Sequence, residues 1–330
     1  MYYCLLAFRP FNLNVGYGDS MENINIAVVD DLLRQQQEKF ISAIFMRDET
    51  ISCNDDIWTD DKGGNGRTVV FCDGDVFEKV AVNFSNIKGD NLPPAATNKR
   101  PDLKGHSFNA VGLSIVSHPK NPFVPTSHEN LRFFSTTSSE NPQWWFGGGF
   151  DLTPYVGFKS DAVEWHRAAY NACCCIGEEY YLTFKDLCDH YFFIKHRKEH
   201  RGIGGLFFDD FNDFEFERCL EFVKAVGEEF LSSYMKILDR RQDHSFSKDD
   251  ILFKNYRRGR YAEFNLVLDR GTLFGLQFGG RIESILASLP PIVHWPHSIS
   301  QEFKFREANL LTDYLTPKDW LNLNPKTISE

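Results

Sequence analysis

The chain has 330 residues, which allows one large domain or two average ones. Its residues are 42% hydrophobic and 25% charged, an ordinary globular composition, and no run of about 18 apolar residues predicts a membrane-spanning helix. The formal net charge of −10 argues against nucleic-acid binding, because phosphate contacts need a local excess of Lys and Arg. An anionic small molecule could still bind clustered arginines.

The N-terminal part is predicted to form an arm followed by a helix. Residues 1–11 lack the features of a signal or transit peptide, so they are expected to be an extended arm or translation upstream of a second start at Met21. Apolar residues at helical spacing then predict an amphipathic helix over 29–46. The eight cysteines include the run Cys173-Cys174-Cys175 and no C-x-x-C pair, which favours reduced thiols and a cytoplasmic protein.

The rest of the chain contains groups of strands separated by blocks of helices. Alternating patterns and turn residues such as Asp73-Gly74 predict strands at 68–74, 76–87, 108–119, 131–137, 143–152 and 203–211. Helical spacing predicts helices at 159–199, with a break near Ile176-Gly177, and at 213–241, 281–291 and 300–315. The stretch 261–277 is predicted to be two strands joined by a turn at 269–271.

Consecutive strand groups of this kind are typical of an α+β fold with a mostly antiparallel sheet. No internal repeat or convincing linker occurs, so we predict one domain, with the arm and first helix in 1–50 and the main body in 51–330. The predicted hairpin at 261–277 carries apolar residues that would be hazardous at a free sheet edge, and a homodimer formed near it would cover them.

Two segments have the residue types of a binding or catalytic site. Residues 113–134 place His118, His128, Asn130 and Arg132 in a proline-rich connection between apolar strands, and rigid loops often carry functional groups. An arginine in this aromatic setting suits a carboxylate partner, through paired hydrogen bonds. The alternative is a surface turn with incidental polar residues.

The second segment, 143–158, passes from aromatic residues through three glycines to Asp151. Glycines permit close approach of the backbone to a flat ligand, and a carboxylate beside them could act as a base or bind NH groups. The alternative is a glycine bulge in which Asp151 caps a helix or turn.

Further histidines and arginines leave two more possibilities open. His118, His128, His166 and His196 could converge on a divalent metal, although scattered histidines are more often satisfied structural residues. The arginines of 257–260 and Arg281 suit a ligand with several carboxylates.

These residues lie in segments that resemble the oxygen-dependent coproporphyrinogen III oxidase family. The matching stretches are GLSIVSHPKNPFVPTSHENLRFF, WWFGGGFDLTPY, DHYFFIKHRKEHRGIGGLFFDD, RRGRYAEFNLVLDRGTLFGL and GGRIESILASLP, in the order that the family has them. Five long, non-repetitive matches are highly specific. Three departures stand within or between them, namely Glu129 in place of an apolar residue, Phe150 in place of a smaller one and Glu164 in place of a histidine.

The resemblance implies roles for individual residues. Those expected to contact substrate are Ser114, Asn130, Leu131, Arg132, Gly279, Gly280 and Arg281. His128 is expected to act as a proton donor, and Asp151 and Arg132 to hold the tetrapyrrole. His118, His128, His166 and His196 match positions proposed for metal ligands, and the departure at Glu164 weakens that role.

The resemblance also implies a fold and a reaction. The fold is a curved antiparallel sheet flanked by helices, paired into a homodimer, with 51–330 as the catalytic domain. The reaction converts two propionates of coproporphyrinogen III to vinyl groups with O2 as acceptor, giving protoporphyrinogen IX without an organic cofactor. Two alternatives remain, a metal-dependent oxygenase and a non-catalytic tetrapyrrole carrier, and a carrier has no use for Asp151 and His128 together.

Overall fold

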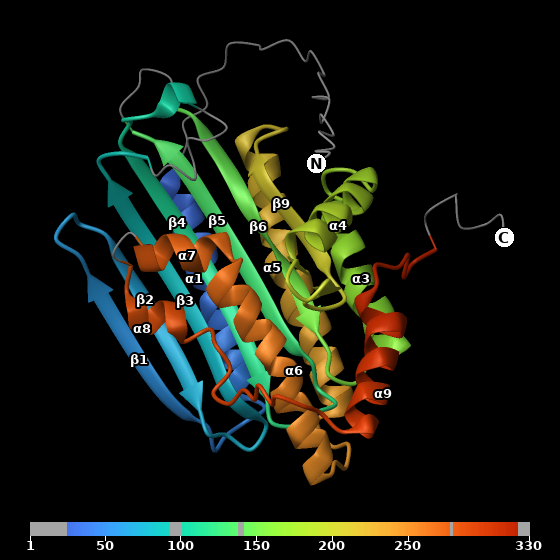
Figure 1. Ribbon diagram of the computed structural model, residues 1–330. Coiled ribbons are helices and arrows are strands. Elements are labelled where there is room, and N and C mark those ends of the chain that lie inside the picture. Colours follow the sequence, from blue (N-terminus) through green and yellow to red (C-terminus); the bar gives the residue numbers. More distant parts are fainter. Residues whose placement is uncertain (1–24, 93–100, 138–141, 278–279, 323–330) are drawn as a thin grey trace, which may run out of the picture.

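The computed structural model describes residues 25–92, 101–137, 142–277 and 280–322, so the predicted arm lies outside the described residues. One seven-stranded antiparallel sheet dominates it (Figure 1). Its strands, in spatial order, are β1 (Ser52–Thr59), β2 (Asn65–Cys72), β3 (Phe77–Gly89), β4 (Phe108–Pro119), β5 (Thr126–Thr136), β6 (Trp144–Thr153) and β9 (Gly205–Phe211). The predicted α+β class is confirmed.

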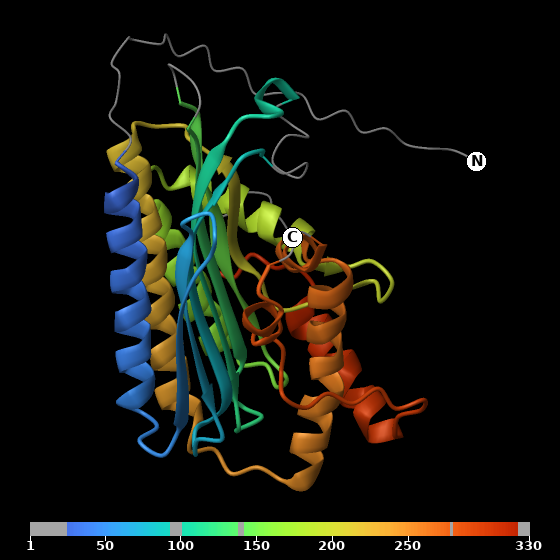
Figure 2. The same cartoon turned by 90° about the vertical axis from the view of Figure 1, so that its left-hand side faces the viewer.

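Helices cover both faces of the sheet (Figure 2). One face carries α1 (Ile26–Phe45) and α5 (Phe216–Arg241), and α3 (Lys159–Cys173) packs against α5. The other face carries α6 (Lys248–Val267), α7 (Arg270–Gln277) and α8 (Ile282–Leu286). The remaining elements are η1 (Pro101–Leu103), α4 (Glu179–Tyr191), the short strands β7 (Phe193–Ile194) and β8 (Glu199–His200), α9 (Gln301–Leu310) and a π-helical turn, Leu311–Leu315.

The main core lies between the sheet and the layer of α1, α3 and α5. In α1, Val29, Leu33, Phe40 and Ile44 are buried at the predicted helical spacing, and the Phe40 ring stacks on Phe230 of α5 at 5.6 Å. Such apolar burial is the main stabilising contribution to a fold of this size. The seven cysteines within the described ranges are all free thiols.

The predicted hairpin at 261–277 is wrong, because this stretch is helical. It contains the end of α6 and all of α7. The Ser247–Asp250 capping box starts α6, and the segment that follows buries Tyr261 and Phe264 while Leu266 and Val267 stay exposed. That spacing fits one face of a helix, and with few β-branched residues the segment has little preference for a strand.

Two further differences lie near the sheet edges. The predicted helix over 159–199 ends at Tyr191, and the β7–β8 hairpin follows, so His196 lies in a turn. The edge strand β1 was not predicted, because its side chains are largely exposed and lack apolar alternation.

Glu129 is a buried acid on the core side of β5. Its side chain is 1% exposed, and within the described residues its Oε1 has no hydrogen-bond partner. Burial raises the pKa of this carboxyl to about 8. A carboxyl in the unfolded chain ionises near pH 4.5, so the unfolded state releases a proton that the folded state retains. The free energy of unfolding should therefore fall as pH rises from about 4.5 to 8.

We expect Glu129→Gln to remove this pH dependence. The difference in free energy of unfolding between the variant and the parent chain should grow by about 2–5 kcal/mol from pH 5 to pH 8, in favour of the variant. This is the scale of a pKa raised by a few units. Urea denaturation at both pH values measures it, with Glu164→Gln as a control because Glu164 pairs with Lys236 outside the core. A gain that does not change with pH would contradict this account of Glu129.

Candidate active site

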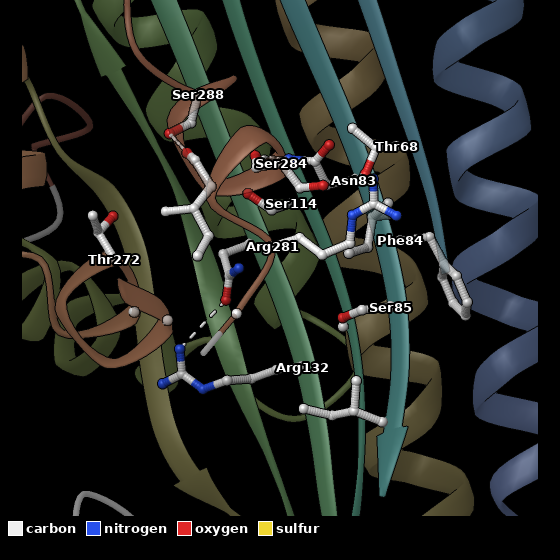
Figure 3. A pocket seen from close by; sticks show the side chains of 18 of the residues that line it. Thr68, Asn83, Phe84, Ser85, Ser114, Arg132, Thr272, Arg281, Ser284 and Ser288 are labelled. Atoms are coloured by element: carbon white, nitrogen blue, oxygen red, sulfur yellow. Dashed lines mark hydrogen bonds between the residues drawn. The ribbon is translucent and has the colours of Figure 1, made fainter. Parts of the chain in front are cut away.

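A cleft of about 1240 Å³ lies between the sheet and the helices α7 and α8. It is larger than most small-molecule sites, which span roughly 300–1,000 Å³. Figure 3 shows Ser114 next to Ser284 of α8 and close to the Arg281 side chain, with Arg132 farther along the same wall of the cleft. Hydrogen bonds tie α8 to the strands, one between the Thr68 and Ser284 hydroxyls at 2.7 Å and one from the Asn83 amide to the Ser284 carbonyl at 2.9 Å.

Strand alternation sorts the residues of β5 between the two faces of the sheet. His128, Asn130 and Arg132 line the cleft, while Leu131 and Phe133 are fully buried in the core. Ser114 of β4 lies opposite Asn130, so it shares this face. The predicted contact residues Ser114, Asn130 and Arg132 are therefore brought together, whereas the Leu131 side chain points into the core.

The three glycines of β6 allow neighbouring strands and Arg132 to come close. A Cβ on Gly149, whose φ is +143°, would lie 2.1 Å from the Leu206 carbonyl oxygen of β9. A Cβ on Gly147 would lie 2.8 Å from Nε of Arg132. The glycines thus serve protein packing first, although Gly148 and Gly149 also line the cleft.

Asp151, His128 and Arg201 form one buried network at the wall of the cleft. The Asp151 carboxylate is 2.8 Å from Nδ1 of His128, and it accepts hydrogen bonds from Arg201 at 2.5 and 3.1 Å. Asp151 and Arg201 side chains are each 1% exposed, while His128 and Arg201 line the cleft. The carboxylate requires a donor at Nδ1, which leaves Nε2 of His128 as the nitrogen that can exchange a proton.

The surroundings of Arg201 keep Asp151 ionised. Burial by itself would raise the pKa of the Asp151 carboxyl, but the Arg201 charge and the hydrogen bond with His128 outweigh it, so that pKa is lowered. The Arg201 guanidinium lies over the rings of Phe192 and Tyr261, at 4.2 and 4.5 Å, and donates to Asn265 at 2.6 Å. A buried pair with these additional partners holds the imidazole of His128 in one orientation.

Arg132 and Arg281, which line the cleft, and Arg270, beside it, are each paired with an aspartate. Arg132 donates to Asp209 of β9 at 2.7 Å, and Arg270 of α7 donates to the same carboxylate at 3.1 Å. Arg281, just before α8, pairs with Asp56 of the edge strand β1 and lies over the Trp58 ring. Arginines supplied from the sheet and from the covering helices are suited to a ligand with several carboxylates.

The comparison with known families agrees with this geometry. Residues 28–320, more than half of the chain, match the model of the coproporphyrinogen III oxidase family. The chain belongs to this family. Its general function therefore lies in haem biosynthesis, and coproporphyrinogen is the substrate that the family implies. None of the helices in the described part of the chain is long and apolar enough to cross a membrane.

The histidines matching proposed metal positions in the family have separate partners. His118 contacts Thr126 and the Ser288 carbonyl, and His166 contacts Tyr181 and the Ile203 carbonyl, so both ring nitrogens of each are engaged. Burial lowers the pKa of both, which keeps them neutral. His196 lies in the β7–β8 turn and pairs with Glu263 of α6.

This donor set does not fit a metal ion. Across the described ranges, no group of three or more His, Cys, Asp or Glu side chains is placed to hold one. His118, His128, His166 and His196 instead form hydrogen bonds or ion pairs within the protein.

The structure adds residues that sequence reasoning missed. The sequence pattern assigns no role to Arg201 and predicts a hairpin turn at Asp269 and Arg270, but all three lie at the cleft or beside it. Asp209 lies within β9, directly after the apolar run that ends at Phe208. The one available signal was the polar end of that strand. Gly280 lines the cleft, whereas Gly279 lies outside the described residues.

Proposed function

We propose that the protein is an oxygen-dependent coproporphyrinogen III oxidase. In this reaction two propionates of coproporphyrinogen III become vinyl groups, and the product is protoporphyrinogen IX. The observation that carries the proposal is one cleft, in a member of this family, that combines Arg132 of the sheet and Arg281 before α8 with the buried Asp151–His128 pair. The arginines supply carboxylate binding, and the pair supplies proton transfer.

The arginines would hold the propionate groups of the substrate. Arg132 projects from the sheet, and Arg270 and Arg281 come from the covering helices, so carboxylates on different sides of a flexible ring can be bound at once. Ser114 and Asn130 add hydroxyl and amide groups to the sheet surface between them. Contacts at several points of the ring would fix the position of the reacting propionate relative to His128.

His128 would move the proton, and Asp151 would act through it. The sequence suggested that Asp151 itself accepts hydrogen bonds from the pyrrole NH groups. Its 1% exposure and its bonds to Arg201 and His128 favour a positioning role instead. A carboxylate on Nδ1 orients the imidazole and stabilises its protonated form, as in other Asp–His pairs.

The chemistry balances without an organic cofactor. Each propionic acid side chain loses CO2 together with two hydrogens, and O2 accepts the corresponding two electrons and two protons. The reduced tetrapyrrole ring is electron-rich and can react with O2 directly. The cleft contributes binding, proton transfer and partial exclusion of water from the reactive intermediate.

A product assay under controlled oxygen tests the proposal. The purified chain should convert coproporphyrinogen III to protoporphyrinogen IX in air and form no product under nitrogen, with CO2 released in step. Tight binding of the tetrapyrrole without turnover in air would instead identify a carrier, and product formation without oxygen would exclude the oxygen-dependent reaction.

We expect turnover to survive exhaustive chelation. The ring nitrogens of His118 and His166 are already bonded within the protein, so removing divalent ions should leave the cleft unchanged. Activity before and after chelation, with metal content measured in both samples, checks this. Loss of activity that a single divalent ion restores would establish the metal-dependent alternative.

We also propose a homodimer, now because apolar residues are exposed at the end of α6. Residues 261–277 are helical, so they offer no free strand edge, but Leu266 and Val267 still expose apolar surface at the end of α6. We expect light scattering to give twice the chain mass at micromolar concentration. Val267→Glu should shift the protein towards monomer, whereas Met46→Glu, at an exposed residue beyond α1, should not. A parent chain that is monomeric would contradict the proposal.

A further inference from the structure

Asp209 connects two arginines that come from different parts of the fold. Its carboxylate accepts from Arg132 of β5 at 2.7 Å through one oxygen and from Arg270 of α7 at 3.1 Å through the other. Figure 3 places Arg132 on the side of the cleft where Thr272 of α7 lies. The bridge therefore joins the sheet to a covering helix at the edge of the cleft.

Each guanidinium is held by a second set of contacts. Arg132 lies across Gly147, where a Cβ would meet it, and donates to the Asn130 amide oxygen at 3.3 Å. Arg270 lies over the Tyr191 ring at 5.0 Å, and the Tyr191 hydroxyl donates to Asp269 at 2.8 Å. Only Nη2 of each guanidinium contacts Asp209 in these bonds. A guanidinium has five N–H donors, so each retains donors for another carboxylate.

We propose that Asp209 is a positioning residue that holds Arg132 and Arg270 together as a clamp for one propionate of the substrate. This inference rests on the proposed function. Two guanidinium groups that converge on one place repel each other, and Asp209 offsets one of the two charges. The remaining positive charge matches a single carboxylate.

The exposures explain why the clamp needs Asp209. The Arg270 side chain is 54% exposed and Arg132 is 29% exposed, whereas Asp209 is 21% exposed. Without the bridging carboxylate, Arg270 is free to turn to solvent. Arg132 would then bind the propionate alone, with the loss of one charge-assisted contact.

The test compares two ligands that differ only in their carboxylates. Coproporphyrin III, the oxidised and unreactive ring, is titrated by fluorescence into the parent chain and Asp209→Asn, and its tetramethyl ester is titrated in parallel. Asp209→Asn should bind the acid about tenfold more weakly and the ester unchanged, since one charge-assisted contact is worth about a factor of ten. Asp213→Asn is the matched control, because Asp213 is exposed just beyond β9 and accepts from Tyr180.

Arg270→Gln provides a second variant that does not depend on how Asp209→Asn folds. It should show the same selective loss of the acid, and the double variant should lose no more than either single one. Equal weakening of acid and ester, or no change in either, would overturn the clamp. A parent chain that turns over no coproporphyrinogen would refute the proposed function. Failure of the clamp is separate from this, because it is measured by the binding of coproporphyrin III to the parent chain and its variants.

Discussion

Arg132→Ala should lower turnover by at least about a hundredfold while the chain remains folded, the scale of a lost charge-assisted anchor with a misplaced substrate. Arg132 is only partly exposed, at the floor of the cleft, and its guanidinium contacts Asp209 and Asn130. In the alanine variant Asp209 keeps Arg270 but loses Arg132, so a propionate at this wall of the cleft would meet one positive charge fewer than in the parent chain. Turnover and melting temperature of the same preparation measure the effect.

Lysine at position 132 should restore little of this activity. An ammonium group lacks the planar fork that can contact Asp209 and a propionate together. The matched control is Arg47→Ala, because Arg47 has similar exposure and also pairs with an aspartate, Asp239, on the opposite face of the sheet. Near-normal turnover by Arg132→Ala would remove Arg132 from the site.

Asp151→Asn should lose both stability and turnover, for separable reasons. The stability falls by about 3–5 kcal/mol, because the substitution leaves the buried Arg201 charge without its partner. The turnover per folded molecule falls by at least about a hundredfold, because His128 loses the carboxylate that orients it. Binding of coproporphyrin III should weaken only modestly, since Asp151 does not line the cleft.

A double variant separates action through His128 from a direct contact with substrate. If Asp151 acts through the imidazole, adding Asp151→Asn to His128→Asn should reduce turnover no further than His128→Asn alone. If Asp151 binds the pyrrole NH groups directly, the two losses should multiply and analogue binding should fall sharply. A destabilised Asp151→Asn variant with full turnover per folded molecule would leave Asp151 a purely structural role.

Local patterns in the sequence were sufficient for much of the fold. The strand predicted at 131–137 corresponds to the second half of β5, and helical spacing predicted α1 and α5. These patterns work because a half-buried strand or helix must turn its apolar residues to one side. The segment 261–277 failed on the same criterion, since a short apolar run fits a strand or a helix, and only the start of α6 far upstream decides between them.

In the candidate site, too, the sequence indicated some residues and only the structure showed their partners. Residue types in two segments, with the family resemblance, pointed to His128, Arg132 and Asp151 from the sequence. Their partners are distant in the chain, because Arg201 lines the cleft from the segment between β8 and β9, and Asp209 of β9 and Arg270 of α7 pair beside it. Whether an aspartate faces substrate or lies behind a histidine depends on burial, which residue spacing does not encode. The sequence by itself determined which chemistry is present, and the tertiary structure decided which groups touch, because pairing across the sheet joins residues that no local pattern connects.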